Sequence, residues 1–160
     1  MNKSKILSLA QGGIIAALYT VVCVLLAPIS YGNVQVRVAE ALAIMPIFTP
    51  AAIPGLFIGC MLANIIAGGI ALDVIFGSLA TLIGAAGTYL LRNQPPWIAT
   101  IPPIVSNTVI VPLILYYGYG LTLPIWFMMF TVCIGEVIGC GVLGVLLAKA
   151  LNKVNFRLTK

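Results

Sequence analysis

The chain contains no histidine and only three acidic residues among its 160 positions. Without histidine it can form neither a serine–histidine catalytic couple nor an HExxH zinc site. The single aspartate excludes a pair of intramembrane catalytic aspartates, and no Walker lysine motif is present for ATP hydrolysis. Four cysteines occur, but none forms a CxxC pair. We therefore expect no enzymatic activity, no metal site and no cofactor in this chain.

Charge of either sign is scarce, because charged residues make up 7% of the chain and hydrophobic residues make up 62%. The mean hydropathy of +1.18 lies outside the range of soluble domains. Uncharged runs cover residues 6–36, 41–72, 74–91 and 93–135. A membrane-spanning helix needs roughly 20 apolar residues. The sequence therefore predicts an all-α integral membrane protein with one membrane domain over residues 1–160.

Prolines and turn residues divide the uncharged runs into helices. Pro46, Pro50 and Pro54 each remove a backbone donor, which predicts a break at about Thr49–Pro50 between a short second helix and a full third one. The stretch YYGYGLTLP separates the last two helices. The six predicted helices cover about residues 6–29, 38–48, 51–68, 73–91, 97–117 and 123–151.

The basic residues predict the orientation of these spans. With six spans, both termini lie on one side, and only Arg37 among the basic residues falls on the other side. Basic residues gather on the cytoplasmic side of membrane proteins. We therefore expect both termini to be cytoplasmic. The side that they define carries Lys3, Lys5, Arg92, Lys149, Lys153, Arg157 and Lys160.

The stretch CIGEVIGC places Glu136 near the middle of the last predicted span. A carboxylate at that depth costs about 2.5 to 3.5 kcal/mol on insertion scales and commonly faces a pathway or a binding cavity. The alternative is a protonated glutamate that bonds to a neighbouring helix. Asn107, in the middle of the fifth span, allows the same two interpretations, because its amide can bond a heterocyclic ligand or another helix.

The other polar candidates lie toward the predicted outer surface. Asn64 lies near the outer end of the third helix and is a weaker candidate of the same kind as Asn107. Arg37 and Glu40 either form a local ion pair or line an outward pocket. Asp73 either caps the fourth helix or contacts a ligand. On the first helix, Gly12 with Ala16 and Gly13 with Ala17 give two small-residue faces that would allow another helix to approach closely.

The stretch QVRVAEALAIMPIFTPAAIPGLFIGCMLANIIAGGIALDVIFGSLATLIGA, residues 35–85, resembles the queuosine-precursor transporter family. Members of this family are substrate-binding S components of energy-coupling-factor (ECF) transporters. The resemblance implies a bundle of six helices in the bacterial plasma membrane that captures queuine or its aminomethyl-deazaguanine precursor. It also implies two kinds of partner: a transmembrane T component and two cytoplasmic ATPase subunits.

The resemblance also implies roles for the candidate residues. Glu136 or Glu40 would bind the purine-like edge, the other acid or Asp73 would meet the amine, and Asn107 and Arg37 would address the carbonyl side. Asn64 would belong to the same site. Such S components dock through an Ala-x-x-x-Ala pattern on the first helix. Here the matching positions begin with Gly12 or Gly13, which leaves the register of the docking face open.

A stand-alone proton-coupled carrier of a small heterocycle, with Glu136 as its proton site, is the competing hypothesis. The sequence shows no inverted repeat, and its short broken segment has no counterpart in the second half, which disfavours that plan. A purely structural membrane subunit is a third hypothesis. It predicts that Glu136→Gln and Asn107→Ala leave ligand binding unchanged.

Overall fold

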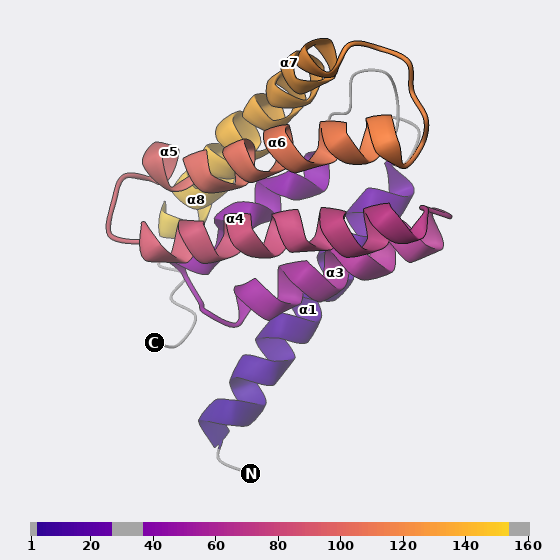
Figure 1. The fold of residues 1–160 in the computed structure, drawn as a ribbon. Helices are drawn as coiled ribbons and strands as arrows, with labels where there is room; N and C mark the ends of the chain where they lie inside the picture. The colour runs from indigo at the N-terminus through magenta and orange to yellow at the C-terminus, as the bar shows by residue number, and fades with distance from the viewer. Residues whose placement is uncertain (1–2, 27–36, 154–160) are drawn as a thin grey trace.

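The computed structural model describes residues 3–26 and 37–153, and throughout these two ranges the chain forms a helical bundle (Figure 1). The predicted all-α class is confirmed for the described residues. In chain order the elements are α1 (Lys3–Leu25), η1 (Val38–Ile47), α3 (Ala52–Ile66), η2 (Asp73–Gly77), α4 (Ser78–Leu90), α5 (Pro96–Ala99), α6 (Ile101–Tyr117), α7 (Ile125–Glu136), η3 (Val137–Leu143) and α8 (Gly144–Lys153).

Four continuous helical stretches among the described residues are long and apolar enough to cross a membrane. They are α1 with 23 residues, η2–α4 with 18, α5–α6 with 22 and α7–η3–α8 with 29. Their bounds agree with the predicted first, fourth, fifth and sixth helices to within a few residues. Residues 27–29 of the predicted first helix lie outside the described residues.

The second and third predicted helices are both short. The helix η1 has ten residues in 3₁₀ form, which gives about 20 Å at roughly 2.0 Å per residue. The helix α3 ends at Ile66 after 15 residues, about 22 Å at 1.5 Å per residue. The bounds of α3 thus match the predicted third helix to within two residues, but α3 is shorter than a membrane core of about 30 Å and is not long enough for a full span. The count of six spans and the side of the termini stay predictions.

The break between η1 and α3 falls at the predicted place. Residues 48–51 form a turn, and the Thr49 hydroxyl accepts a hydrogen bond from the amide N–H of Ala51 at 3.3 Å. The same hydroxyl donates to the Gln11 side-chain oxygen of α1 at 3.0 Å. Pro46 and Pro50 cannot donate from their own backbone nitrogens. The Thr49 side chain therefore stabilises the turn at the prolines and connects this turn to the first helix by a hydrogen bond.

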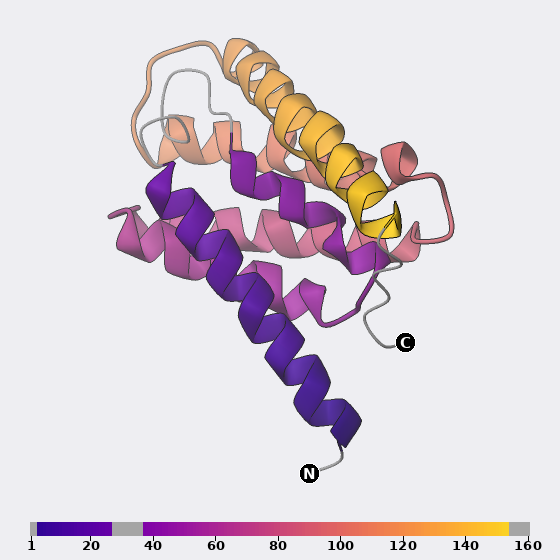
Figure 2. The same cartoon turned by 180° about the vertical axis from the view of Figure 1, so that it is seen from behind.

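The short helix η1 lies in the interior of the bundle (Figures 1 and 2). It packs against η3 and α8 on one side and against α4 and α1 on others. Around it, α1 pairs with α3, and α4 pairs with α6, which in turn packs against α7. Large apolar side chains such as Leu9, Leu25 and Phe130 point away from the bundle with most of their surface exposed, as lipid-facing residues do.

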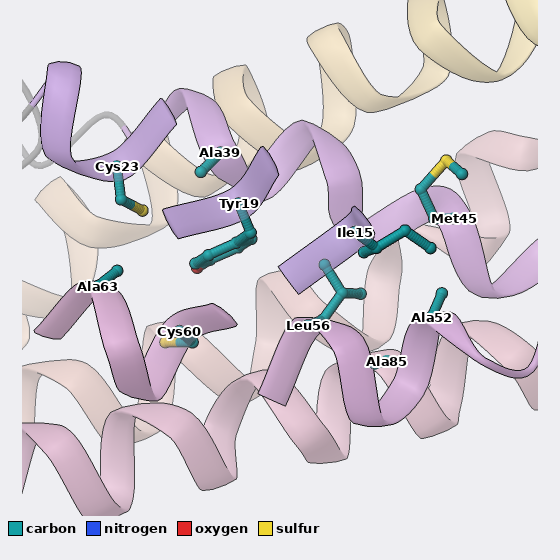
Figure 3. Close-up of a cluster of buried hydrophobic side chains, with 10 residues drawn as sticks. All are labelled: Ile15, Tyr19, Cys23, Ala39, Met45, Ala52, Leu56, Cys60, Ala63 and Ala85. Carbon is teal, nitrogen blue, oxygen red and sulfur yellow. The ribbon is translucent and has the colours of Figure 1, made fainter. Parts of the chain in front are cut away.

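The backbones of α1 and α3 touch along a line of small residues. A Cβ added at Gly55 would lie 2.6 Å from the carbonyl oxygen of Gly12, and one added at Gly59 would lie 2.8 Å from that of Ala16. Only glycine fits at such an approach. Beside this line, Tyr19 of α1 reaches between α1 and α3, where it lies near Cys60 and Ala63 in the buried cluster of Figure 3. The glycines of α3 therefore set the depth at which Tyr19 sits.

Gly55→Ala is expected to destabilise the folded protein by about 1 to 3 kcal/mol, because the added methyl group meets rigid backbone and forces the two helices apart. Thermal unfolding in detergent, followed by circular dichroism, would measure this loss. Gly13→Ala is the matched control, since a Cβ at Gly13 meets nothing within 4 Å. Equal stability of the two variants would contradict the tight packing described above.

Candidate functional site

Two of the three acidic side chains lie together inside the bundle, where Glu40 of η1 faces Glu136 at the end of α7. Asn107 of α6 lies beside both of them. The exposed fractions are 1% for Glu40, 4% for Glu136 and 2% for Asn107. The structure thus brings together three predicted site residues from three separate helical segments. We refer to Glu40 and Glu136 as the carboxyl pair.

The close approach of η1 to the last helix depends on Gly139. A Cβ at this position would lie 2.7 Å from the backbone oxygen of Arg37 and 3.6 Å from the Cβ of Glu40. Gly139 belongs to η3, a π-helical segment that begins directly after Glu136. Such segments occur frequently at functional sites, because they alter the direction of neighbouring side chains. The local sequence after Glu136 therefore positions both members of the carboxyl pair.

Each carboxyl group has one oxygen bonded by the protein. The Tyr19 hydroxyl donates to Oε1 of Glu40, and the Asn107 amide nitrogen donates to Oε1 of Glu136 at 3.1 Å. Within the described residues, Oε2 of Glu40 and Oε2 of Glu136 are buried and have no hydrogen-bond partner. A buried acceptor without a donor costs about 1 to 3 kcal/mol. Two such oxygens mark a place where a ligand that donates hydrogen bonds would be stabilised.

Arg37 supplies positive charge next to the carboxyl pair. Its side chain is 7% exposed, and its charge acts on both Glu40 and Glu136. Its backbone oxygen accepts the amide N–H of Glu40 at 3.0 Å, which fixes the start of η1. Guanidinium donors and carboxylate acceptors in one buried site can bind a flat heterocycle that presents a carbonyl group beside N–H groups.

Asn64 and Asp73 form a second group with Tyr119 of the α6–α7 connection. The Asn64 amide nitrogen donates to the backbone oxygen of Asp73 at 3.2 Å, and the Tyr119 hydroxyl donates to Oδ2 of Asp73 at 3.1 Å. A Cβ at Gly77 would lie 2.9 Å from Oδ1 of Asp73 and 3.2 Å from the Asn64 amide nitrogen. These two predicted site residues thus tie α3, η2 and the α6–α7 connection together.

Of the two interpretations of Asp73, the cap of the fourth helix is not observed in the structure. The helical stretch already includes Leu72, and no side-chain cap hydrogen bond is formed there. The carboxylate of Asp73 instead accepts the Tyr119 hydroxyl. Partial burial, followed by the charge of Asp73, raises the pKa of Tyr119. The hydroxyl therefore stays protonated and continues to donate at neutral pH.

Tyr19 and Tyr119 are contact residues that were not predicted from the sequence. Tyr19 is fully buried, and a buried phenol hydroxyl needs a hydrogen-bond partner. A tyrosine in the middle of the apolar stretch AALYTVVC was therefore the signal that could have indicated a polar partner. Tyr119 gave no such signal, because tyrosines near the end of a span are expected in any membrane protein.

The two small-residue faces of α1 have different surroundings. Gly12 and Ala16 pack against α3 inside the protein, as the contacts of Gly55 and Gly59 show. Gly13 and Ala17 are on the exposed side of α1. Gly12 and Ala16 are thus already covered by this chain, and only the Gly13–Ala17 register faces outward. Docking through that register stays a prediction.

Tyr19→Phe is expected to lower the unfolding free energy by about 1 to 3 kcal/mol, because Oε1 of the buried Glu40 then loses the hydroxyl that donates to it. Chemical denaturation in detergent would measure the change. Tyr116→Phe serves as the control, since Tyr116 is 39% exposed and its ring stacks edge-on against Tyr117. A loss for Tyr19→Phe no larger than that of the control would contradict the importance of the Tyr19–Glu40 bond.

Comparison with known proteins places the chain in a family. The family model described as QueT transporter matches residues 9–153. The queuosine precursor transporter QueT of Lactococcus lactis subsp. cremoris (strain MG1363) is 39% identical over 85 residues, which are 52% of this chain and 50% of that protein. The matched stretch thus spans about half the length of this curated relative, and no solved structure matches. Because the family match covers nearly all of the described helices, the chain belongs to the QueT transporter family.

Proposed function

We propose that this chain is the substrate-capture subunit, or S component, of an ECF importer for a queuosine precursor such as queuine or aminomethyl-deazaguanine. The observation that carries the proposal is the carboxyl pair, with two buried oxygens that lack donors beside Arg37 and Asn107. The similar protein from Lactococcus lactis is described as a queuosine precursor transporter, which supports this substrate class.

The contacts in the site suggest how such a ligand is held. A guanine-like edge presents N–H donors, which match the free oxygen of one acid of the carboxyl pair. The Asn107 amide already donates to Glu136, so the ligand carbonyl is assigned to Arg37. The carboxylate of Asp73 is already bonded by Tyr119. The amine of an aminomethyl substituent is therefore assigned to the other acid of the carboxyl pair rather than to Asp73.

The proposal places the energy source in partner subunits. The sequence has no Walker lysine motif. Two ATPase subunits would therefore hydrolyse ATP, and together with a T component they would drive the substrate across the membrane. The outward register of Gly13 and Ala17 is the surface proposed for docking. Leu91 and Ala148 pack in one cluster, which places their neighbours Arg92 and Lys149 at the same end of the bundle. We assign this end to the cytoplasmic side of the plasma membrane.

Calorimetric titration of the purified chain in detergent tests the binding function. The ligands are aminomethyl-deazaguanine, queuine, guanine and riboflavin as an unrelated vitamin. Tight binding of one deazaguanine and no binding of riboflavin is expected. Tryptophan fluorescence is a poor reporter here, because Trp97 is 62% exposed and Trp126 is 71% exposed. Failure of every deazaguanine to bind folded protein would overturn the proposed substrate.

Uptake into cells or vesicles separates the importer from the proton-coupled carrier. An S component is expected to import its ligand only with active T and ATPase subunits. Inactivating the ATPases by mutation should therefore abolish uptake, whereas a protonophore at constant ATP should leave it intact. Uptake by this chain alone, driven by the proton gradient, would instead favour the carrier with Glu136 as its proton site.

A further inference from the structure

The carboxyl pair has more negative than positive charge around it if both acids are ionised. Among the described residues, Arg37 is the one cation whose charge acts on both Glu40 and Glu136. Residues 27–36 contain no charged side chain in the sequence. Two carboxylates and one guanidinium leave a formal charge of −1 in an interior where these acids are at most 4% exposed.

The other titratable groups that face the pair bring no positive charge. They are Tyr19 and Cys23 from α1, Cys60 from α3 and Cys140 from η3. Asn107 of α6 donates to Glu136 and also faces Glu40, but an amide is neutral. A buried, uncompensated carboxylate usually takes up a proton rather than remain charged. Two neighbouring carboxylates that repel each other commonly share one proton.

The hydrogen bonds leave a position for this proton. Tyr19 bonds Oε1 of Glu40, and Asn107 bonds Oε1 of Glu136. The Oε2 atom of each acid is the free one. A proton on either Oε2 would neutralise one acid and turn an acceptor without a partner into a donor. The second acid would then remain as the counter-ion of Arg37.

We propose that the ligand-free carboxyl pair holds one proton, and that a ligand carrying a single positive charge displaces it. The displacement rests on the proposed function, whereas the proton in the empty protein does not. When the cation binds, one carboxylic O–H bond breaks and its proton passes to the solvent. Two carboxylates then face Arg37 and the ligand cation, so the formal charge of the site is zero. A neutral ligand leaves the proton in place.

This exchange distinguishes charged from neutral ligands by their dependence on pH. While the pair is protonated, binding of the cation releases one proton. Its apparent affinity is therefore expected to rise by about tenfold for each unit of pH. The affinity of a neutral analogue is expected to stay constant over the same range. Selectivity for the cation over the neutral compound thus increases with pH.

Infrared difference spectroscopy of the ligand-free protein tests the proton. The wild type should show the carbonyl stretch of a protonated carboxylic acid at neutral pH, shifted in heavy water. The band should disappear in both Glu40→Gln and Glu136→Gln, because the remaining acid then pairs with Arg37. Asp73→Asn should keep it. If the wild type lacks the band, the proposal is overturned, and no variant is needed for that conclusion. Persistence of the band in either glutamine variant would also overturn it.

Calorimetry in two buffers with different ionisation enthalpies tests the displacement. Aminomethyl-deazaguanine is expected to release about one proton, and its neutral nitrile analogue none. Equal proton release by both ligands, or none by the amine, would overturn the displacement while leaving the capture function in place. If no deazaguanine binds at all, the proposed function fails, and the infrared band still decides whether the pair holds a proton.

Discussion

Glu136→Gln is expected to weaken binding of a deazaguanine by about 100-fold or more. The substitution keeps the size of the side chain, and its amide oxygen can still accept the Asn107 bond seen at 3.1 Å. It removes the charge and presents N–H groups where Oε2 now lacks a donor. A 100-fold loss corresponds to about 2.7 kcal/mol, within the range of hydrogen bonds to charged groups. Calorimetric titration would measure the loss directly.

The matched control for this variant is Asp73→Asn. Asp73 is the remaining acid of the chain, and its carboxylate accepts the Tyr119 hydroxyl. Removal of its charge should change the affinity by less than about threefold if the ligand is held by the carboxyl pair. Circular dichroism of both variants would verify that each one folds. Equal losses of affinity in the two variants would place the ligand elsewhere and argue against Glu136 as its anchor.

Gly139→Leu is expected to abolish detectable binding and to lower the unfolding free energy by about 3 kcal/mol. The first carbon of the new side chain would lie 2.7 Å from the backbone oxygen of Arg37. Such a contact cannot be relieved by rotating a side chain, so η1 must move away from η3. The movement would carry Glu40 away from Glu136 and separate the carboxyl pair. Overpacking of this kind costs about 1 to 3 kcal/mol, and occasionally more.

Gly141→Leu provides the comparison, because it adds the same side chain two residues further along the same π-helical segment. Its Cβ would lie 3.7 Å from a side-chain carbon of Ile104 and 3.8 Å from one of Val137. These are ordinary contacts with flexible groups, so this variant should keep at least half of the wild-type affinity. The comparison of the two variants thus shows whether binding is lost because η1 is displaced or because any large side chain in the last helix disturbs the site.

The prolines and the isolated polar residues made much of this structure predictable. Pro46 and Pro50 predicted the break before α3, because a missing backbone donor has the same effect in any membrane helix. Glu136 and Asn107 were recognisable because polar groups are expensive in an apolar span. Both features act locally. They can be recognised without knowing which helices are neighbours.

Features that depend on how helices are rotated about their axes were not predictable. The first helix carries apolar residues on every side, so its sequence did not indicate that Tyr19 turns inward or that Gly13 turns outward. The separation of Asp73 from the carboxyl pair was not predictable for the same reason, since the sequence does not reveal that the Tyr119 hydroxyl bonds to Asp73. The 3₁₀ form of η1 also escaped prediction. So did its tight packing against η3, because that packing depends on Gly139 from a distant segment.

The contact of α1 with α3 through Gly55 and Gly59 has a mechanical consequence. Most helix pairs are separated by flexible side chains, which absorb small displacements. Here the backbone of α3 contacts the backbone of α1 directly at Gly55 and Gly59, so no flexible side chains separate the two helices there. A tilt imposed on α1 at the exposed Gly13 face would therefore be passed on to α3, and it would also move Tyr19, whose hydroxyl donates to Glu40. A movement of α1 at this exposed face would therefore reach the carboxyl pair.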